Sequence, residues 1–141
     1  MKIIIFDGMS GAGKTTLRYK ILYKFDFNAM IIDRFTPSTW VYDRLAKREL
    51  HDISQIELIM NQLNCNLILC YCNPKLVKER RRVDELRESK FSSEDEYKMF
   101  KEYEKASLYK SIVIIDTSNK SINDSVEEIY KKINLEDNLC H

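Results

Sequence analysis

The sequence has few residues that interrupt regular structure: of its 141 residues, only three are glycine and two are proline. No stretch reads as a flexible linker, a low-complexity segment or an internal repeat. The length is that of one domain that can bury a core of its own. We therefore expect residues 1–141 to form a single domain.

Neither sign of charge is in excess, because 23 lysines and arginines stand against 22 acidic residues. No overall charge would draw the protein to nucleic acid or to a membrane, so stable nucleic-acid binding is not expected. No apolar run approaches the roughly 20 residues of a membrane-spanning helix. Residues 3–6, before the first glycine, are far shorter than the apolar part of a signal peptide. We expect a cytoplasmic protein with no membrane partner.

The four cysteines include no C-x-x-C pair, which argues against a zinc or redox motif. Cys70 and Cys72 lie two residues apart in an apolar run, where they would share one face of a strand. Buried free thiols are the expected state, as in a reducing compartment. The other two are Cys65 and Cys140.

Four short apolar runs are typical of strands that are buried on both faces. Segments with helical spacing separate them, and this alternation predicts a parallel sheet covered by helices on both sides. The predicted fold class is therefore α/β, with three layers and a sheet of about four strands. The runs are residues 2–6, 29–32, 66–71 and 112–115.

Start signals and the 3.6-residue period predict the helices. Proline in the first turn marks the starts near Thr36-Pro37 and Asn73-Pro74. Two capping boxes, Asp52 with Gln55 and Ser93 with Glu96, mark two further starts. The predicted helices cover about residues 13–25, 36–45, 52–63, 74–87, 93–108 and 122–133.

Two features of the chain receive a structural interpretation only. His51 and His141 have no partner visible in the sequence, and we expect both to be exposed and without function. An apolar stripe on the third predicted helix is expected to pack into the core, with a subunit contact as the alternative. The stripe consists of Ile56, Ile59, Met60 and Leu63.

Residues 8–15, Gly-Met-Ser-Gly-Ala-Gly-Lys-Thr, satisfy G-x-x-x-x-G-K-[ST] between an apolar run and a predicted helix. The glycines let the backbone curl so that its N–H groups face phosphate oxygens, and the helix adds its positive end. The lysine would reach the β and γ phosphates, and the threonine hydroxyl would ligate Mg²⁺. The sequence thus predicts a P-loop for ATP and Mg²⁺, with candidate contacts Gly8, Ser10, Gly11, Ala12, Gly13, Lys14, Thr15 and Thr16.

Asp33 and Arg34 directly follow the second predicted strand. Ligands of open α/β sheets bind beyond the carboxyl ends of the strands, where the P-loop also lies. Phosphoryl transfer needs a carboxylate that organises the nucleophile or Mg²⁺, and cations on the transferring group. We interpret Asp33 as a catalytic carboxylate that shares the metal with Thr15, and Arg34 as a catalytic cation. A surface turn pair is the alternative.

Two motifs resemble those of thymidylate kinases. Residues 33–43, Asp-Arg-Phe-Thr-Pro-Ser-Thr-Trp-Val-Tyr-Asp, are similar to the family stretch D-R-[YF]-x-x-S-x-x-A-Y-Q. Residues 6–16 are similar to the family opening [FV]-E-G-x-D-G-x-G-K-T-T. Less specifically, the arginine-rich segment after Pro74 resembles the family's lid, and residues 115–118 resemble the loop that receives adenine. The resemblance implies a P-loop kinase with a lid at about residues 74–92.

The resemblance also implies roles for single residues. The acceptor side of the site would be formed by Asp7, Ser38, Tyr42 and Asp43. From the lid, Arg80 and Arg82 would contact phosphates as catalytic cations, and a solvated helix face laced by acidic neighbours is the alternative for either one. Family members are often dimers through the helices after the D-R motif, so a homodimer is a further expectation.

The sequence departs from the family in the acceptor half. Ser10 stands where the family has Asp, and Asp43 stands where it has Gln. A strand and an R-E-P-G-G-like segment are missing before Asp33, together with an arginine that would grip the acceptor monophosphate. We therefore expect an open acceptor side, with the acceptor phosphate held from elsewhere or an acceptor of another kind.

The leading hypothesis is ATP-dependent phosphoryl transfer to a nucleoside monophosphate. One alternative is a kinase for a nucleoside, a polynucleotide 5′-hydroxyl or another small acceptor, and another is a nucleotide-binding module with weak or no turnover. A GTPase switch is disfavoured, because no D-x-x-G follows the second predicted strand and no N-K-x-D follows the third.

Overall fold

The computed structural model describes the backbone of residues 1–83 and 90–139, and the side chains of residues 1–80 and 90–134. The described residues form four strands and six helices in alternation. The strands are β1 (Lys2–Gly8), β2 (Ala29–Asp33), β3 (Asn66–Tyr71) and β4 (Ile112–Asp116). The helices are α1 (Lys14–Lys24), α2 (Thr36–Leu45), α3 (Ser54–Gln62), α4 (Pro74–Val83), α5 (Ser93–Ala106) and α6 (Ile122–Leu139).

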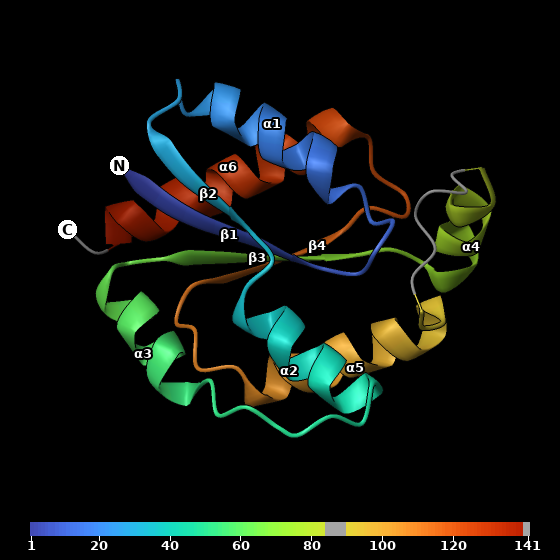
Figure 1. The fold of residues 1–141 in the computed structure, drawn as a ribbon. Coiled ribbons are helices and arrows are strands. Elements are labelled where there is room, and N and C mark those ends of the chain that lie inside the picture. The colour runs from blue at the N-terminus through green and yellow to red at the C-terminus, as the bar shows by residue number, and fades with distance from the viewer. Residues whose placement is uncertain (84–89, 140–141) are drawn as a thin grey trace.

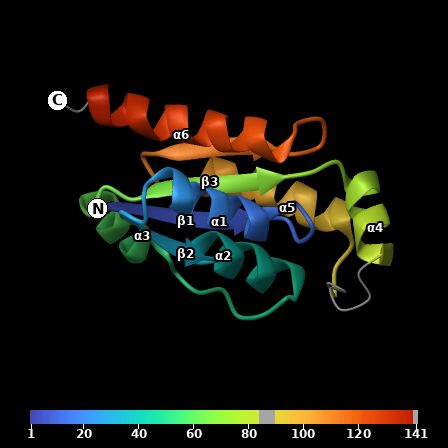
Figure 2. The same ribbon diagram turned by 90° about the horizontal axis from the view of Figure 1, so that it is seen from above.

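The four strands form one parallel sheet in the order β2-β1-β3-β4. Helices α1 and α6 cover one face of this sheet, and α2, α3 and α5 lie on the other face (Figure 1). Helix α4 lies at one end of the sheet, beyond the carboxyl end of β3 (Figure 2). The predicted three-layer α/β fold is confirmed.

The sheet is most deeply buried at its two central strands. Every residue of β3 is buried, and so are the last five residues of β1. Strand β2 is an edge strand that is only partly covered, with Met30 47% exposed. Among the described residues, no strand pairs with the outer edge of β2.

The strand order places a ligand site between β1 and β3. The chain leaves β1 toward β2 on one side and later returns to β3 on the other side. In doubly wound sheets, ligands bind at such a reversal, outside the carboxyl ends of the strands. The loop that follows β1 is the predicted P-loop, which therefore lies at this point (Figure 2).

Two predicted capping boxes are wrong. Helix α5 is capped by Ser92, whose side chain accepts a hydrogen bond from Asp95 N, while the Ser93 hydroxyl donates to Pro74 O at 2.9 Å. Helix α3 begins after Ile53 without a side-chain cap. Asp52 instead accepts hydrogen bonds from the backbone N and the hydroxyl of Ser54. Both predictions had the right helix and the wrong cap.

The predicted packing of the apolar stripe on α3 is corrected, because Ile56, Ile59 and Leu63 are 42%, 54% and 53% exposed and so lie mostly outside the core. His51 is exposed, as predicted, although its Nδ1 lies 2.8 Å from Asp43 Oδ2, a partner that the sequence did not show. His141 lies outside the described residues. The buried free thiols are confirmed for three cysteines, Cys65, Cys70 and Cys72. Cys140 lies outside the described residues.

Within the part of the chain that the structure describes, none of the helices has the length and apolar character that crossing a bilayer requires.

Candidate active site

The loop between β1 and α1 has the backbone that the P-loop pattern requires. Gly8, Gly11 and Gly13 have φ angles of 123°, 82° and 83°, which side chains rarely tolerate. At Gly8 a Cβ atom would lie 2.2 Å from the carbonyl oxygen of Cys70 on β3. The first glycine thus lets the loop turn away while β1 stays in contact with β3.

Lys14 opens α1 and is buried beneath this loop. Its Nζ donates to the carbonyl oxygens of Met9 at 2.5 Å and Gly8 at 3.4 Å. Burial, and secondly the charge of Arg34, lowers the pKa of Lys14 to about 8. A phosphate near Nζ would favour the charged form of the amine, so an anion would bind favourably here.

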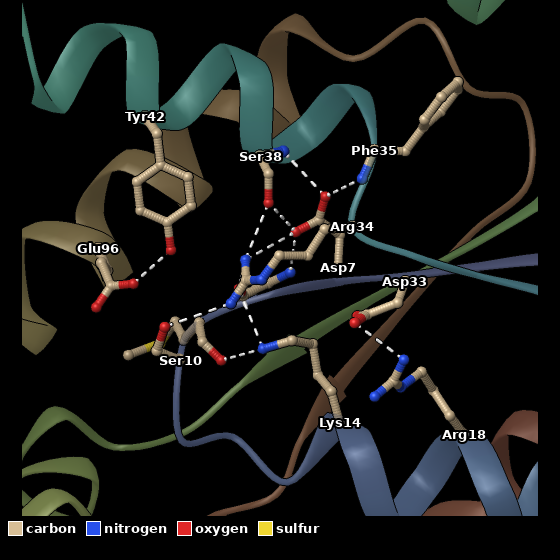
Figure 3. A network of polar contacts seen from close by, with 12 residues as sticks. Asp7, Ser10, Lys14, Arg18, Asp33, Arg34, Phe35, Ser38, Tyr42 and Glu96 are labelled. Carbon is tan, nitrogen blue, oxygen red and sulfur yellow. Dashed lines mark hydrogen bonds and ion pairs between the residues drawn. The ribbon is translucent and has the colours of Figure 1, made fainter. Parts of the chain in front are cut away.

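Asp7 connects the P-loop strand to the start of α2. Its Oδ2 accepts hydrogen bonds from the backbone N atoms of Phe35 at 3.0 Å and Ser38 at 2.9 Å. Its Oδ1 accepts from Gly8 N and from the Ser38 hydroxyl (Figure 3). Helix α2 has no cap from its own N-cap residue, so the Asp7 carboxylate supplies one from β1.

Arg34 lies over the P-loop and connects it to α2. Its Nη1 donates to Gly8 O at 3.1 Å and to the Ser38 hydroxyl at 2.9 Å, and lies 3.4 Å from Asp7 Oδ1. Its Nη2 donates to the Ser10 hydroxyl at 3.3 Å (Figure 3). The backbone of Arg34 has a φ of 58°, a strained value that holds the turn between β2 and α2. The guanidinium therefore lies beside the phosphate loop.

Tyr42 forms an aromatic wall with residues from beyond α4. Its ring stacks on Phe91 with centroids 6.0 Å apart, and the Arg34 guanidinium lies 5.7 Å from the ring centroid. Its hydroxyl donates to Oε1 of the buried Glu96 at 2.6 Å. Burial raises the pKa of Tyr42 to about 12, so the hydroxyl stays protonated. A flat, apolar ring system of this kind suits a nucleobase.

Asp33 and Thr15, the predicted Mg²⁺ ligands, both contact Arg18 of α1. Arg18 Nη1 lies 2.9 Å from Asp33 Oδ2 (Figure 3). Arg18 Nη2 donates to Thr15 Oγ1 at 3.2 Å. The carboxylate and the hydroxyl therefore contact the same guanidinium. A hydroxyl and a carboxylate are ligands that Mg²⁺ prefers, with phosphate and water completing its shell, so the residues fit this ion.

The described side chains do not form a metal site made of protein ligands alone. Among the described side chains, no group of three or more His, Cys, Asp and Glu residues could hold a metal ion. Mg²⁺ in phosphoryl-transfer sites commonly has one or two protein ligands and is otherwise held by substrate phosphates. The pair formed by Thr15 and Asp33 is of that type.

These groups surround a cavity of about 800 Å³. Most of the predicted phosphate-binding residues line it, as do Asp33, Arg34, Tyr42 and Arg80. Arg80, from α4, also donates from Nη1 to Gly11 O at 3.0 Å. The predicted site residues that line the cavity are Ser10, Gly11, Ala12, Gly13, Lys14, Thr15, Asp33, Arg34, Tyr42 and Arg80.

Other predicted site residues lie elsewhere. The Asp7 side chain is fully buried beneath Arg34 and Ser38, and Asp43 faces His51 and Arg48. Neither lines this cavity, and their role as acceptor contacts stays a prediction. Gly8, Thr16 and Ser38 are also absent from its wall, although Ser38 orients Arg34. The side chain of Arg82 lies outside the described residues.

Sequence reasoning missed several residues of the site. Lys90 and Phe91 line the cavity after α4, and Lys120 and Ser125 line it near the start of α6. Lys90 and Phe91 belong to the segment predicted as a lid, but no motif marked either residue, and none marked Lys120 or Ser125. Arg18 did have a signal, because it follows Lys14 by four residues and Thr15 by three, and so shares their helix face.

One end of the cavity is formed by the loop between β4 and α6. The Thr117 hydroxyl donates to Ala12 O at 3.0 Å and so joins this loop to the P-loop. The Ser125 hydroxyl is buried and has no hydrogen-bond partner among the described residues. The resemblance had indicated residues 115–118 as the adenine loop, and the structure places Thr117 on the cavity wall.

Comparisons with known proteins support the fold. No protein-family model matches the chain, and no curated protein matches it. The structure of the YorR protein of Bacillus subtilis, in complex with phosphorylated GDP, superposes with a TM-score of 0.77 at 19% sequence identity. The match covers 97% of this chain and 98% of that chain.

A second similar structure is that of deoxyadenosine kinase from M. mycoides with bound dATP. It superposes with a TM-score of 0.62 at 20% identity, covering 95% of this chain and 100% of that chain. At this level of identity the likeness establishes the fold. The chain therefore has the fold of the P-loop nucleoside and nucleotide kinases.

Proposed function

We propose that this protein is a kinase that transfers the γ-phosphoryl group of ATP, with Mg²⁺, to a nucleoside monophosphate, as thymidylate kinases do. One observation carries the proposal. A single cavity of about 800 Å³ is lined both by the P-loop and by Asp33, Arg34 and Tyr42. A module that only bound a nucleotide would not need a carboxylate, a guanidinium and an aromatic wall opposite the phosphate loop.

On the donor side, the P-loop would cradle the ATP phosphates with its backbone N–H groups and Lys14. The base would lie toward Thr117 and Ser125, where a buried hydroxyl lacks a partner among the described residues. Mg²⁺, when bound, would neutralise phosphate charge beside Thr15 and Asp33. Arg34 lies within hydrogen-bond distance of the loop and would stabilise charge on the transferring group.

On the acceptor side, Tyr42 and Phe91 would hold the base, and Asp33 would orient the attacking oxygen. The arginine that is missing with the deleted strand would be replaced by cations from α4 and the residues after it. Arg80 and Lys90 both line the cavity. This assignment gives the acceptor phosphate a partner without the deleted segment.

A nucleoside acceptor is the second candidate. The partly exposed Asp33 side chain supports it, because a carboxylate of this kind could accept the proton of a nucleoside hydroxyl. The fold shared with deoxyadenosine kinase is consistent with this candidate.

The test is an acceptor screen. The protein is incubated with Mg-ATP and a panel of nucleosides and nucleoside monophosphates, and both ADP formation and the phosphorylated product are measured. The proposal expects the highest rate with a monophosphate. A higher rate with a nucleoside would select the second candidate, and no ADP above background with any acceptor would contradict both.

Two variants of α1 make the screen specific to this site. Lys14→Ala is expected to lower the rate at least ~10²-fold, as loss of a group that stabilises the transition state typically does. Lys20→Ala removes an exposed lysine of the same helix and should leave the rate unchanged. Equal rates for wild type and Lys14→Ala would mean that the activity comes from another site or a contaminant.

A further inference from the structure

Arg18 occupies the place between the two side chains that fit Mg²⁺. Its guanidinium contacts Asp33 Oδ2 at 2.9 Å with one nitrogen and Thr15 Oγ1 at 3.2 Å with the other. The two contacts come from different elements, because Asp33 ends β2 and Thr15 belongs to the first turn of α1. No motif assigns a role to this arginine.

The alternative carboxylate near the P-loop is already engaged. The Asp7 side chain is fully buried, and its two oxygens accept from Gly8, Phe35 and Ser38. Asp33 is the carboxylate that faces the cavity, with a side chain that is 47% exposed. Arg18 therefore pairs with the carboxylate that faces the cavity, where a ligand could reach it.

We propose that Arg18 is a resident cation of the metal site, which holds Asp33 and Thr15 in the nucleotide-free protein and competes with Mg²⁺ for them. The inference rests on the proposed nucleotide binding at the P-loop. Mg²⁺ can bind Asp33 and Thr15 only after both have released Arg18. Arg18 therefore raises the Mg²⁺ concentration that is needed to fill the site. It acts through Asp33 and Thr15 and is a positioning residue.

The contacts of Arg18 make such an exchange feasible. Its side chain is 23% exposed and Asp33 is 47% exposed, so water can replace each partner when the pair opens. Pairs with this exposure typically contribute less than about 1 kcal/mol. The Arg18 Nε atom is buried without a hydrogen-bond partner in the described part of the chain, so this guanidinium is incompletely satisfied where it lies.

The experiment measures Mg²⁺ loading by binding and not by turnover. A fluorescent ADP analogue is bound to the protein in EDTA, and the complex is then titrated with Mg²⁺. Arg18→Gln is expected to lower the half-saturating Mg²⁺ concentration about two- to fivefold, the range that corresponds to an exposed ion pair. Its affinity for the analogue in EDTA should match that of the wild type.

Controls separate competition from a general charge effect. Lys20→Gln removes the same charge from an exposed position of α1 and should leave the Mg²⁺ midpoint unchanged. In an Asp33→Asn background, Arg18→Gln should have little further effect, since the competition runs through that carboxylate. Circular dichroism and thermal unfolding of each variant establish that it is folded.

Three results would overturn the inference. An unchanged midpoint in Arg18→Gln means that the arginine does not compete, and a raised midpoint means that it assists the ion. Weaker binding of the analogue in EDTA means that Arg18 contacts the nucleotide directly. If the wild type binds no ADP analogue, the proposed function fails as well. If it binds the analogue with any of these three results, only the role of Arg18 fails.

Discussion

Asp7 is the residue on which the site depends without belonging to its wall. Its buried carboxylate accepts two backbone N–H groups at the start of α2, one from Gly8, and the hydroxyl of Ser38. These contacts place Arg34 and Ser38 beside the P-loop. Asp7 thus connects the P-loop motif to the Asp33-Arg34 motif, although the two lie far apart along the chain.

Asp7→Asn is predicted to destabilise the fold strongly. The amide would present N–H donors to backbone donors, and it would leave Arg34 beside a neutral group. Removing one partner from a buried charged network typically costs about 3–5 kcal/mol of unfolding free energy. Urea unfolding measures this loss. Asp116→Asn, at an exposed aspartate that accepts from Ser118 N, is the control and should cost less than about 1 kcal/mol.

Lys14 predicts a pH dependence of nucleotide binding. In the free protein its pKa is lowered to about 8, chiefly by burial. A bound phosphate favours the charged amine and raises this pKa, so binding above about pH 8 must take up a proton. Affinity should be steady below that pH and fall by up to about tenfold per pH unit above it.

The measurement is a titration with ADP in EDTA at several values between about pH 7.5 and about pH 9.5. Lys14→Arg is the control, because arginine stays protonated throughout this pH range. The affinity of this variant for ADP should therefore not change with pH. A wild-type affinity that does not fall would show that the Lys14 charge does not contribute to binding.

At the residue scale, the sequence motifs identified candidate residues but not how their side chains pack. Arg34 and Tyr42, both taken from motifs, line the cavity, and their roles in binding and catalysis stay predictions. The burial of Asp7 depends on how α2 docks against β1, and no local pattern records that. The contact between Arg18 and Asp33 likewise joins two elements across the fold.

At the scale of elements, the turn from β1 into the P-loop depends on glycine for two different reasons. At Gly8 an added Cβ would overlap the backbone of Cys70, at 2.2 Å from its oxygen. At Gly13 no described atom beyond the neighbouring residues lies within 4 Å of such a Cβ, although the φ of 83° disfavours a side chain. Packing against Cys70 excludes a side chain at Gly8, whereas only the backbone conformation disfavours one at Gly13.

This difference predicts unequal effects of alanine. Gly8→Ala must push β1 away from β3 and should abolish stable folding. Gly13→Ala should cost only about 1–2 kcal/mol, the usual penalty of a left-handed conformation. Thermal unfolding of the two variants measures both effects. Similar melting temperatures for the two would mean that the strand pair at Gly8 can open without loss.

Strands and helix starts were both predicted to within two residues, whereas the capping residues of two helices were not, and the reason is physical. The four apolar runs lie within one or two residues of β1 to β4, because burial on both faces demands uninterrupted apolar sequence. Ser92 and Ser93 are both able to cap α5, and their sequence does not decide between them. Contact with Pro74 O engages Ser93, so Ser92 takes the cap.

At the scale of the whole molecule, the cavity joins segments from most of the chain. Its walls come from the P-loop, the end of β2, helices α2 and α4, the residues after α4, and the start of α6. Two ligands in it would therefore stabilise the fold through different contacts. The donor would rely on Lys14, and the acceptor would rely on the wall formed by Tyr42 and Phe91.

This arrangement predicts two separable thermal shifts. A ligand at about 100 times its Kd adds about 2.7 kcal/mol, which corresponds to a rise in Tm of roughly 10 °C for a chain of this size. Lys14→Ala should lose most of the shift produced by Mg-ADP and keep the shift produced by an accepted monophosphate. Tyr42→Ala should show the reverse, each variant being compared with its own unliganded Tm.

The pairing of variants tests whether the cavity has two halves. Tyr42 contacts Arg34 and Glu96 as well as Phe91, so its loss lowers the starting stability of the variant. The free energy that a ligand adds depends on its affinity for the folded state, so the comparison that matters is whether each variant keeps or loses a shift above its own unliganded Tm. If Tyr42→Ala loses both shifts, the aromatic wall and the P-loop serve a single ligand, and the division into donor and acceptor sides is wrong.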